Sequence, residues 1–352
     1  MKISLIVPVH TGRGGYAAEL IREALSEPVP DLELVIVDSS VGEERKILAK
    51  ECQNYDALYL AGPKDAASKR NIGAHAAVGE YLLFVDSDCL ISPDSIRNHI
   101  EFMDGSAPDV AAAIGPTLMI GNDNHYPWTV LRHSLKYNQC YDWPDRYERV
   151  LWGTTSNLVV RRNDFLASGG FRPMLPAPVG GEDVDFGVRL TELGRSIATN
   201  PDAKVRHRRE HITSLRPVAR SLYYYGVADA ALATHHPARS MRHFPSTAAT
   251  VGAGAAMTVL AGRTHLGWKG GAIVGAATGI AVLEKARRSG SLYTATGTKT
   301  SGRREWLRWL PARCLDAVFD LGVTAGAIRA KRPVLALRRF RYVNETEFRE
   351  KP

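Results

Sequence analysis

Cysteine is scarce in this chain of 352 residues, which contains only 4 cysteines and no C-x-x-C pair. A zinc knuckle or a disulfide framework needs closely spaced cysteines, so neither is predicted, and a reducing compartment fits the chain. The N-terminus also lacks an apolar run long enough for a signal peptide, because Pro8 already interrupts it. We therefore expect the N-terminal part of the chain to stay in the cytoplasm.

Acidic residues are scarce in the second part of the chain. Residues 216–352 contain 8 Asp or Glu against 22 Lys or Arg, whereas residues 1–215 contain 29 against 23. The net charge of +8 is thus the sum of −6 and +14. This split predicts an acidic globular domain followed by a basic region that meets an anionic partner. No nucleic-acid recognition motif accompanies the basic residues, which favours anionic lipid over RNA and predicts no nucleic-acid partner.

The first part of the chain has the pattern of a doubly wound α/β fold. Apolar runs at Ile3–Val9 and Glu33–Asp38 predict two buried strands, and the segment Tyr16–Leu25 predicts a helix between them. A strand, a helix and a strand form a βαβ unit, whose strands are parallel. Ligands bind beyond the carboxyl ends of such strands, where His10, Asp38 and Asp86 are expected.

Two carboxylates one residue apart follow a third buried strand. The run Tyr81–Val85 leads directly into Asp86-Ser87-Asp88. Acids in this position can share a hard divalent cation, whose remaining coordination positions take diphosphate oxygens. A solvated turn is the simpler alternative because Asp and Ser are common turn residues, and the short motif alone does not separate the two.

Charged residues also begin two predicted helices. Lys69 and Arg70 lie near the start of a short helix, where cations oppose the helix dipole; this indicates a bound anion, an acidic partner or a solvated face. In Gly181-Glu182-Asp183-Val184-Asp185 a glycine-hinged loop becomes a helix with three acids in its first turn. Capping and acid-base chemistry both explain these acids.

Together these motifs occur in a family-like order: Ile6-Val7-Pro8-Val9, Val37-Asp38, Lys69-Arg70-Asn71-Ile72-Gly73, Gly79-Glu80-Tyr81 with Asp86-Ser87-Asp88, Gly169-Gly170-Phe171 and Gly181-Glu182-Asp183-Val184-Asp185. The order resembles that of family 2 glycosyltransferases of the GT-A fold, over roughly residues 1–215. The resemblance implies a doubly wound mixed α/β sheet and an inverting enzyme. Such an enzyme moves a sugar from a nucleotide diphosphate donor, here a UDP-sugar, to an acceptor hydroxyl with Mn²⁺ or Mg²⁺.

The resemblance also implies residue roles. Asp183 corresponds to the catalytic base, Glu182 and Trp152 lie on the acceptor side, and Asp86, Asp88 and His207 hold the metal, with His207 preferred over His211. The donor-binding residues implied are Pro8, His10, Asp38, Lys69, Arg70, Asn71, Asp86, Ser87 and Asp88. One departure concerns the second strand, which ends in Asp38-Ser39-Ser40 where family members often have two adjacent acids.

The region 216–352 is expected to be mostly helical and membrane-associated, at the cytoplasmic face of the cell membrane. Its segment Ser221–Pro237 resembles the glycosyltransferases of mycofactocin biosynthesis. Phe244–Gly262 and Leu266–Leu283 are Gly- and Ala-rich apolar stretches, and Arg303–Leu310 and Arg338–Tyr342 mix arginine with aromatic residues as interfacial helices do. The alternative is a soluble helical hairpin packed on the N-terminal domain.

Two other functions remain open at this stage. A sugar-1-phosphate nucleotidyltransferase would use a Gly-rich loop after the first strand, which Thr11-Gly12-Arg13-Gly14-Gly15 provides. The helix start at Glu182-Asp183 and the Gly169-Gly170-Phe171 turn argue against it. A non-catalytic membrane scaffold is disfavoured by the presence of every expected carboxylate.

Overall fold

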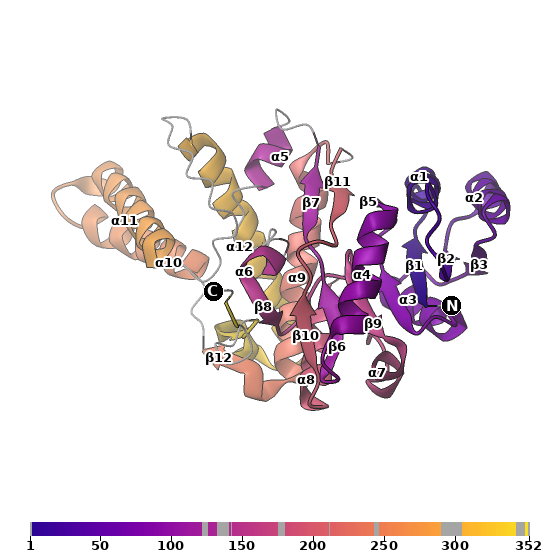
Figure 1. Cartoon of the computed structure of the whole chain (residues 1–352). Helices are drawn as coiled ribbons and strands as arrows, with labels where there is room; N and C mark the ends of the chain where they lie inside the picture. Colours follow the sequence, from indigo (N-terminus) through magenta and orange to yellow (C-terminus); the bar gives the residue numbers. More distant parts are fainter. Residues whose placement is uncertain are drawn as a thin grey trace. The chain divides into compact units, whose positions relative to one another are not determined.

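The computed structural model describes residues 2–121, 126–131, 141, 143–174, 180–210, 212–242, 246–289, 305–342 and 349–350. The chain divides into two compact units, whose elements are labelled in Figure 1. The N-terminal unit comprises Met1–Thr129, Cys140–Pro217 and Tyr342–Pro352, and the C-terminal unit comprises Val130–Gln139 and Val218–Arg341. The division at Pro217 lies close to the predicted boundary at residue 215, but the last residues of the chain belong to the N-terminal unit.

A nine-stranded mixed sheet forms the centre of the N-terminal unit. Its order is β14-β8-β10-β6-β9-β4-β1-β2-β3, and a second sheet has the order β5-β11-β7. The strands are β1 Ile3–Val9, β2 Leu32–Asp38, β3 Leu58–Ala61, β4 Tyr81–Phe84, β5 Cys89–Ile91, β6 Val110–Ile114, β7 Thr117–Ile120, β8 Tyr147–Val150, β9 Leu158–Arg161, β10 Ser196–Thr199, β11 Val205–Arg208 and β14 Arg349–Glu350.

Strand direction is constant in one part of this sheet and changes several times in the rest. Strands β3, β2, β1 and β4 are parallel neighbours, as the βαβ pattern predicts. Strand β9 is antiparallel to both β4 and β6, and β8 is antiparallel to β10. The sheet is therefore mixed, which confirms the sheet type that the resemblance implied. Strand β10 ends at Thr199, and β11, which begins at Val205, belongs to the second sheet.

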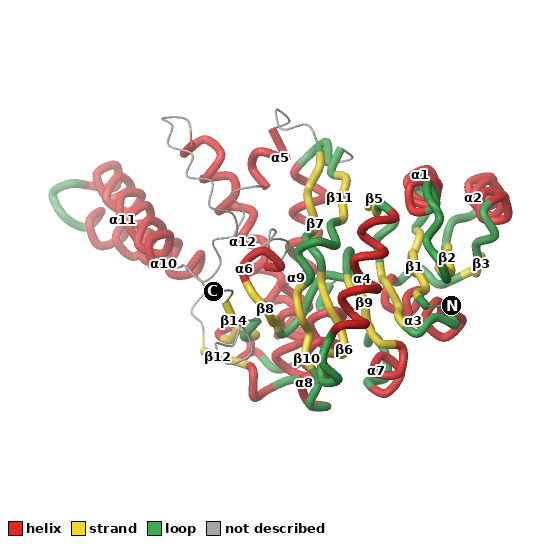
Figure 2. The backbone as a smooth tube through the Cα atoms, viewed as in Figure 1, coloured by secondary structure: helices red, strands yellow, loops and turns green. Residues whose placement is uncertain are grey.

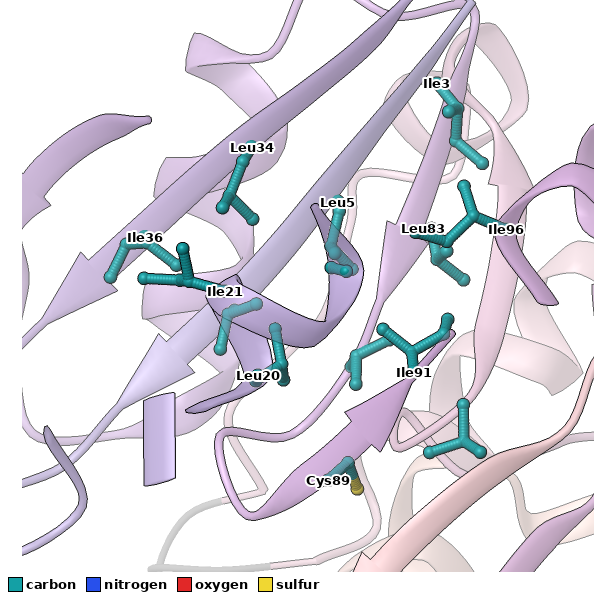
Figure 3. Packing of buried hydrophobic residues seen from close by; sticks show 14 of the residues in the cluster. Ile3, Leu5, Leu20, Ile21, Leu34, Ile36, Leu83, Cys89, Ile91 and Ile96 are labelled. Carbon is teal, nitrogen blue, oxygen red and sulfur yellow. The ribbon is translucent and has the colours of Figure 1, made fainter. Parts of the chain in front are cut away.

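The helices before Pro217 surround this sheet (Figure 2). They are α1 Gly14–Ala24, α2 Gly42–Asn54, α3 Ala66–Ala76, α4 Pro93–Gly105, α5 Tyr126–Leu131, α6 Trp143–Arg146, α7 Arg162–Ala167 and α8 Glu182–Glu192. Figure 3 shows Leu20 and Ile21 of α1 against Leu5, with all three side chains fully buried. Apolar spacing on α1 thus covers one face of the parallel strands, and burial of each such side chain stabilises the fold by about 1.5 to 3 kcal/mol.

The C-terminal unit is mainly helical, as predicted. Its helices are α9 Leu215–His235, α10 Ser246–Gly262, α11 Gly267–Ser289 and α12 Glu305–Arg329, with 3-10 turns at Pro237–Arg239 and Pro333–Leu337 and a two-stranded sheet of β12 Ser240–Arg242 and β13 Arg338–Phe340. Helices α9 and α12 approach closely, since a Cβ on Gly226 would lie 2.8 Å from the backbone nitrogen of Val323. Among the described helices, none combines the length and the apolar character needed to cross a membrane.

One segment predicted to meet lipid headgroups is instead used inside the C-terminal unit. Arg339 and Phe340 of the run Arg338–Tyr342 are buried. The Arg339 guanidinium pairs with Asp320, and the Arg338 Nε donates to the Ser240 hydroxyl at 2.7 Å. Arg338 and Arg339 stabilise the β12–β13 corner, so the side chains of these two arginines are bonded within the unit and not to lipid headgroups.

His99 makes the stability of the N-terminal unit sensitive to acid. The ring is fully buried, its Nε2 lies 2.8 Å from Asn157 Oδ1, and burial lowers its pKa from 6.5 to about 4. The unfolded chain therefore binds a proton below pH 6.5 that the folded chain does not bind until pH 4. The contribution of His99 to the free energy of unfolding is present above pH 6.5 and is lost as the pH falls, by about 2 kcal/mol at pH 5.

The measurement is urea unfolding of the wild-type chain and of His99→Gln at pH 7.5 and pH 5. The wild-type protein should lose more stability between the two pH values than the variant does. Groups that both proteins share cancel in this comparison. Equal pH dependence of the two proteins would show that His99 does not carry the effect.

Candidate active site

The carboxyl ends of the parallel strands meet around the buried side chain of Lys69, on α3. Its ammonium donates to Val9 O at 2.6 Å, to the Ser39 hydroxyl at 3.1 Å and to His10 Nδ1 at 3.0 Å. Burial lowers the pKa of Lys69 to about 8. Desolvation and the charges of Lys69 and Arg70 lower the pKa of His10 to about 4, so its ring is neutral at pH 7. Lys69 therefore connects the ends of β1 and β2 and donates a hydrogen bond to the neutral ring of His10.

Asp38 is held just as firmly at the end of β2. Its carboxylate is buried and accepts from the Ser40 backbone N–H at 2.8 Å, from the Ser40 hydroxyl and from the Tyr59 hydroxyl at 2.8 Å. Ser39 stands in the position of the second acid, and Ser40, the next residue, caps Asp38. Two further residues predicted to bind the donor, Pro8 in β1 and Ser87 after β4, are also buried.

Arg70 lies at the centre of the charged groups. Its Nη2 donates to Asp86 Oδ1 at 2.7 Å and its Nη1 donates to Glu182 Oε1 at 3.1 Å. Burial opposes its charge, but the carboxylates of Asp86 and Glu182 raise the pKa of Arg70 above its ordinary value. The guanidinium is almost fully buried, and its Nε has no hydrogen-bond partner within the described residues. Arg70 thus connects the acid that follows β4 to the helix that carries Asp183.

Asp88 and His207 form the group best suited to a metal ion. The Asp88 Oδ1 lies 3.1 Å from His207 Nε2, and Arg13 Nη1 contacts Asp88 Oδ2 at 3.1 Å. Burial opposes ionisation, but the hydrogen bond from His207 and the charges of Arg13 and Arg209 hold the pKa of Asp88 well below its ordinary value. Adjacent ligands of an octahedral ion with bonds of about 2.1 Å are about 3 Å apart, so this spacing fits one ion.

The third member of this group is not a ligand for a hard cation. Cys89 Sγ lies within 4.8 Å of the ligand atoms of Asp88 and His207. Burial and the charges of Asp86 and Asp88 raise the pKa of its thiol well above 9. Figure 3 shows Cys89 among the buried apolar side chains of the core. Asp86, which was predicted to share the metal, lies outside this group and is paired with Arg70.

The neighbours of His207 define what metal binding requires. His207 lies within β11, not at a strand end, and Arg209 Nη2 is 3.1 Å from its Nδ1. Because a guanidinium only donates, the neutral ring carries its proton on Nε2 and donates it to Asp88. A cation bound at Nε2 would need a lone pair on that nitrogen. The ring proton would then have to move to Nδ1, where it would displace the contact from Arg209. His211 lies outside the described residues.

Asp183 is placed at the start of α8 with a strongly perturbed pKa. Gly181 precedes the helix with a φ of 90°, a left-handed conformation that glycine adopts without strain. Burial and the charge of Glu182 raise the pKa of Asp183 to about 7, although Arg70 opposes the shift. A carboxylate that exchanges its proton near neutral pH is suited to act as a general base.

The Asn71 side chain binds the glycine turn that supports this helix. It is not directed at a ligand. Its amide donates to Phe171 O at 2.8 Å and accepts from the Phe171 N–H at 2.9 Å. A Cβ on Gly170 would lie 2.7 Å from the Asn71 amide oxygen, which explains the glycine. Both polar groups of Asn71 are therefore used inside the protein, and its predicted role in donor binding has no support in its contacts.

Arg189 fixes the same turn to α8. Its Nε donates to Asp185 Oδ2 at 2.8 Å, and its other nitrogens donate to the carbonyls of Ser168 and Gly170. Asp185 is fully buried. The pair lies four residues apart on one helix face, the spacing at which side chains meet. Asp185 is thus a structural acid, as the capping alternative for this helix start suggested.

Breaking this pair should destabilise the protein strongly. Arg189→Met leaves the Asp185 carboxylate buried without its cation, and we expect a loss of about 3 to 5 kcal/mol in the free energy of unfolding. Urea unfolding measures the change. The control is the double variant Asp185→Leu/Arg189→Met, which removes both charges and should recover part of the loss. A single variant as stable as the wild type would contradict this role.

Trp152 packs inside the N-terminal unit. The side chain is 6% exposed, its ring lies 5.1 Å from that of Trp143 in an edge-on arrangement, and its Nε1 donates to Tyr342 O at 3.2 Å. The alternative of a core tryptophan therefore describes its surroundings better than a sugar-stacking wall does. Glu182, the other residue predicted on the acceptor side, is paired with Arg70.

Sequence reasoning missed Arg13, which contacts Asp88 and lies in the Gly-rich loop after β1. For Arg209, beside His207, it left two possibilities open, a role in holding the diphosphate and a solvated position. Contacts between segments so far apart in the chain have no local signal. Arg189 did have one, because its spacing of four from Asp185 on a predicted helix indicates a pair.

The comparisons with known proteins agree with this fold. Residues 4–175 match the family model described as Glycosyl transferase family 2. The matched segment belongs to that family, and the resemblance predicted from the sequence is confirmed.

Among curated proteins, the chain is similar to the pre-mycofactocin glycosyltransferase of Mycobacterium tuberculosis, with 28% identity over 244 residues. That alignment covers 67% of this chain and 48% of the relative, so the chain spans about half the length of the relative. An uncharacterised glycosyltransferase of Rickettsia conorii is 31% identical over 105 residues, which is 29% of this chain and 17% of that protein.

Among solved structures, the chain is similar to a mannosyltransferase from Pyrobaculum calidifontis in complex with GDP-Man and Mn²⁺. The TM-score is 0.52 at 16% identity, with 93% of this chain and 86% of that chain covered. At this identity the likeness concerns the fold alone, which is the GT-A fold with its mixed central sheet.

Proposed function

We propose that the protein is an inverting, metal-dependent glycosyltransferase that moves a sugar from a nucleotide diphosphate donor to an acceptor hydroxyl. One observation carries the proposal. Arg70 joins Asp86, beside the paired ligands Asp88 and His207, to the helix start where Asp183 has a pKa of about 7. One side chain, Arg70, thus contacts both the acid beside the proposed diphosphate site and the residue next to the proposed base.

The reaction needs a base for the acceptor hydroxyl and positive charge for the leaving diphosphate, and the residues of the site supply both. The ionised Asp183 takes the proton of the acceptor hydroxyl while the oxygen of that hydroxyl forms a bond to the anomeric carbon. The bond from that carbon to the diphosphate oxygen breaks on the opposite face, which inverts the anomeric configuration. The electron pair of this bond leaves with the nucleoside diphosphate, and Arg13 and Lys69 contribute positive charge near it.

Asp88 and His207 would hold the divalent cation, Mn²⁺ or Mg²⁺. When bound, the cation neutralises charge that develops on the leaving diphosphate. The spacing and burial of Asp88 and His207 fit such an ion, and their oxygen and nitrogen ligand atoms suit Mn²⁺. The mannosyltransferase of known structure that shares the fold was solved with Mn²⁺. Asp86 contributes by orienting Arg70.

A UDP-sugar is the proposed donor, and Asp38 is the acid proposed to contact its uracil base. The test is a thermal-shift screen of UDP- and GDP-sugars with and without Mn²⁺, because a ligand that binds only the native state raises the melting temperature. Stabilisation by a UDP-sugar that depends on Mn²⁺ is the expected result. Stabilisation by GDP-sugars alone would move the donor to the other nucleotide and leave the transferase proposal intact.

The Gly-rich loop after β1 argues against a nucleotidyltransferase. A phosphate-binding loop needs backbone N–H groups that face the ligand. Here the N–H groups of Gly12 and Gly14 donate to the Glu44 carboxylate at 2.9 Å. A carboxylate of the protein thus occupies the place of an anion. Product analysis separates the two reactions, because a glycosyltransferase releases nucleoside diphosphate and a nucleotidyltransferase releases pyrophosphate.

The proposal includes a location, the cytoplasmic face of an anionic membrane. The charge of +14 on residues 216–352 supports it, since each Lys or Arg near an anionic surface contributes about 1 kcal/mol of attraction. Fractionation of the full-length chain in low salt tests it. The acceptor is proposed only as a molecule with a hydroxyl group.

A further inference from the structure

Helices α10 and α11 form an antiparallel hairpin whose contact face is made of small residues (Figure 1). A Cβ on Gly271 would lie 2.6 Å from Thr258 O, and one on Gly275 would lie 2.5 Å from Gly254 O. No side chain fits between the helices at these points. Such close packing through small residues holds helices together without burying large apolar side chains.

The large apolar side chains of the hairpin face outward. Leu260 is 60% exposed, Leu266 49%, Trp268 63% and Ile273 71%. A water-soluble hairpin normally places such residues in its contact face, and this one has the opposite arrangement. Contiguous exposed apolar residues of this kind mark an interaction surface.

Charge identifies the partner. Residues 244–283 contain no Asp or Glu, and their basic residues are Arg263, His265 and Lys269, all at or beside the turn and all exposed. These cations alternate with Leu266 and Trp268 in the sequence Arg-Thr-His-Leu-Gly-Trp-Lys. Tryptophan beside Lys and Arg is typical of the membrane interface. Two copies of the same turn would repel each other, which disfavours self-association.

The length of the hairpin sets its position. Helix α10 has 17 residues and is about 25 Å long, shorter than the hydrocarbon core of about 30 Å. Within residues 244–283 the turn also carries the only Lys and Arg, which would be costly to place in hydrocarbon. A hairpin that lies in the interface satisfies both constraints, with its apolar face toward the acyl chains and its turn among the headgroups.

We propose that the turn of the α10–α11 hairpin, centred on Leu266 and Trp268 and flanked by Arg263 and Lys269, docks on an anionic lipid bilayer. This inference gives the proposed membrane location a specific element and does not depend on which group the enzyme transfers. It replaces Arg338–Tyr342, in which Arg338 and Arg339 bond to residues of the same unit, as the basic aromatic segment that meets lipid.

The test is sedimentation of the full-length chain with vesicles of phosphatidylcholine alone and of equal parts phosphatidylcholine and phosphatidylglycerol. Binding should favour the anionic vesicles. Arg263→Ser/Lys269→Ser should weaken it about tenfold or more, and Leu266→Ser/Trp268→Ser should weaken it on both vesicle types. In 1 M salt, charge interactions are screened beyond roughly 3 Å. The wild type should then keep the apolar part of its binding, which Leu266→Ser/Trp268→Ser lacks.

Matched controls lie on α12 and just after its end, in the same unit. Leu321→Ser/Ile328→Ser removes two apolar side chains of similar exposure, and Arg329→Ser/Arg332→Ser removes two exposed cations. Neither should change vesicle binding. Stabilisation of each variant by nucleotide with Mn²⁺ is measured in parallel, so that loss of docking is distinguished from failure of the transferase proposal.

A second measurement does not need a polar substitution. Lipids brominated in the acyl chain should quench the fluorescence of the wild type more than that of Trp268→Phe. Equal quenching, binding that the turn variants do not alter, or wild-type protein that stays in the supernatant with anionic vesicles would overturn the proposal. Dimers that dissociate in Leu266→Ser/Trp268→Ser would overturn it too and assign the face to a second copy of the chain.

Discussion

Replacement of Asp183 by Asn is expected to lower turnover by about 10²- to 10⁴-fold, the usual cost of losing a general base. The amide cannot take the acceptor proton, but it keeps the shape of the side chain at the start of α8. Donor affinity should therefore stay near that of the wild type. The measurement is the rate of nucleoside diphosphate release at saturating donor, together with donor binding by thermal shift.

The pH dependence of the same step gives an independent check. A base with a pKa of about 7 is ionised above pH 7, so kcat/KM should be level there and fall about tenfold per pH unit below it. Because the charge of Glu182 raises the pKa of Asp183, Glu182→Gln should move this inflection to lower pH. Wild-type turnover in Asp183→Asn would assign the base elsewhere, first to Glu182.

Several parts of the fold were predictable because their signals are local. The apolar runs gave β1, β2 and β4, and the glycine before Glu182 predicted the start of α8, where a positive φ is needed. The acids at the strand ends were found because parallel strands place their carboxyl ends at one edge. Each of these inferences uses neighbours in the sequence or a general rule of chain direction.

Partner choice within the site could not be predicted, since it depends on contacts between distant segments. Lys69 and Arg70 were noticed as cations that oppose a helix dipole, and the sequence left a bound anion, an acidic partner or a solvated face open as the reason. The structure gives them protein partners, the ends of β1 and β2 for Lys69 and two carboxylates for Arg70. Likewise the adjacency of Asp86 and Asp88 suggested one shared ion, whereas their side chains have different partners.

The difference between these two acids leads to the second large effect. Removing even an outer partner of a metal ligand typically costs about 10- to 100-fold in metal affinity, so Asp88→Asn or His207→Ala should cost at least that much. At a ligand concentration of 100 times Kd the wild type gains about 2.7 kcal/mol on binding, and a 100-fold weaker site gains only about 0.4 kcal/mol. The metal-dependent rise in melting temperature with UDP should therefore almost disappear.

The neighbouring thiol provides the matched control for this prediction. Cys89→Ala changes the third member of the same group, but its buried neutral thiol is not expected to bind Mn²⁺, so the metal-dependent stabilisation by UDP should remain. Melting curves without ligand establish that each variant is folded. Full metal dependence in a folded Asp88→Asn variant would exclude Asp88 as a ligand. If Asp86→Asn alone abolished it, the ion would lie at Asp86, and Arg70 would have to release that carboxylate when the donor binds.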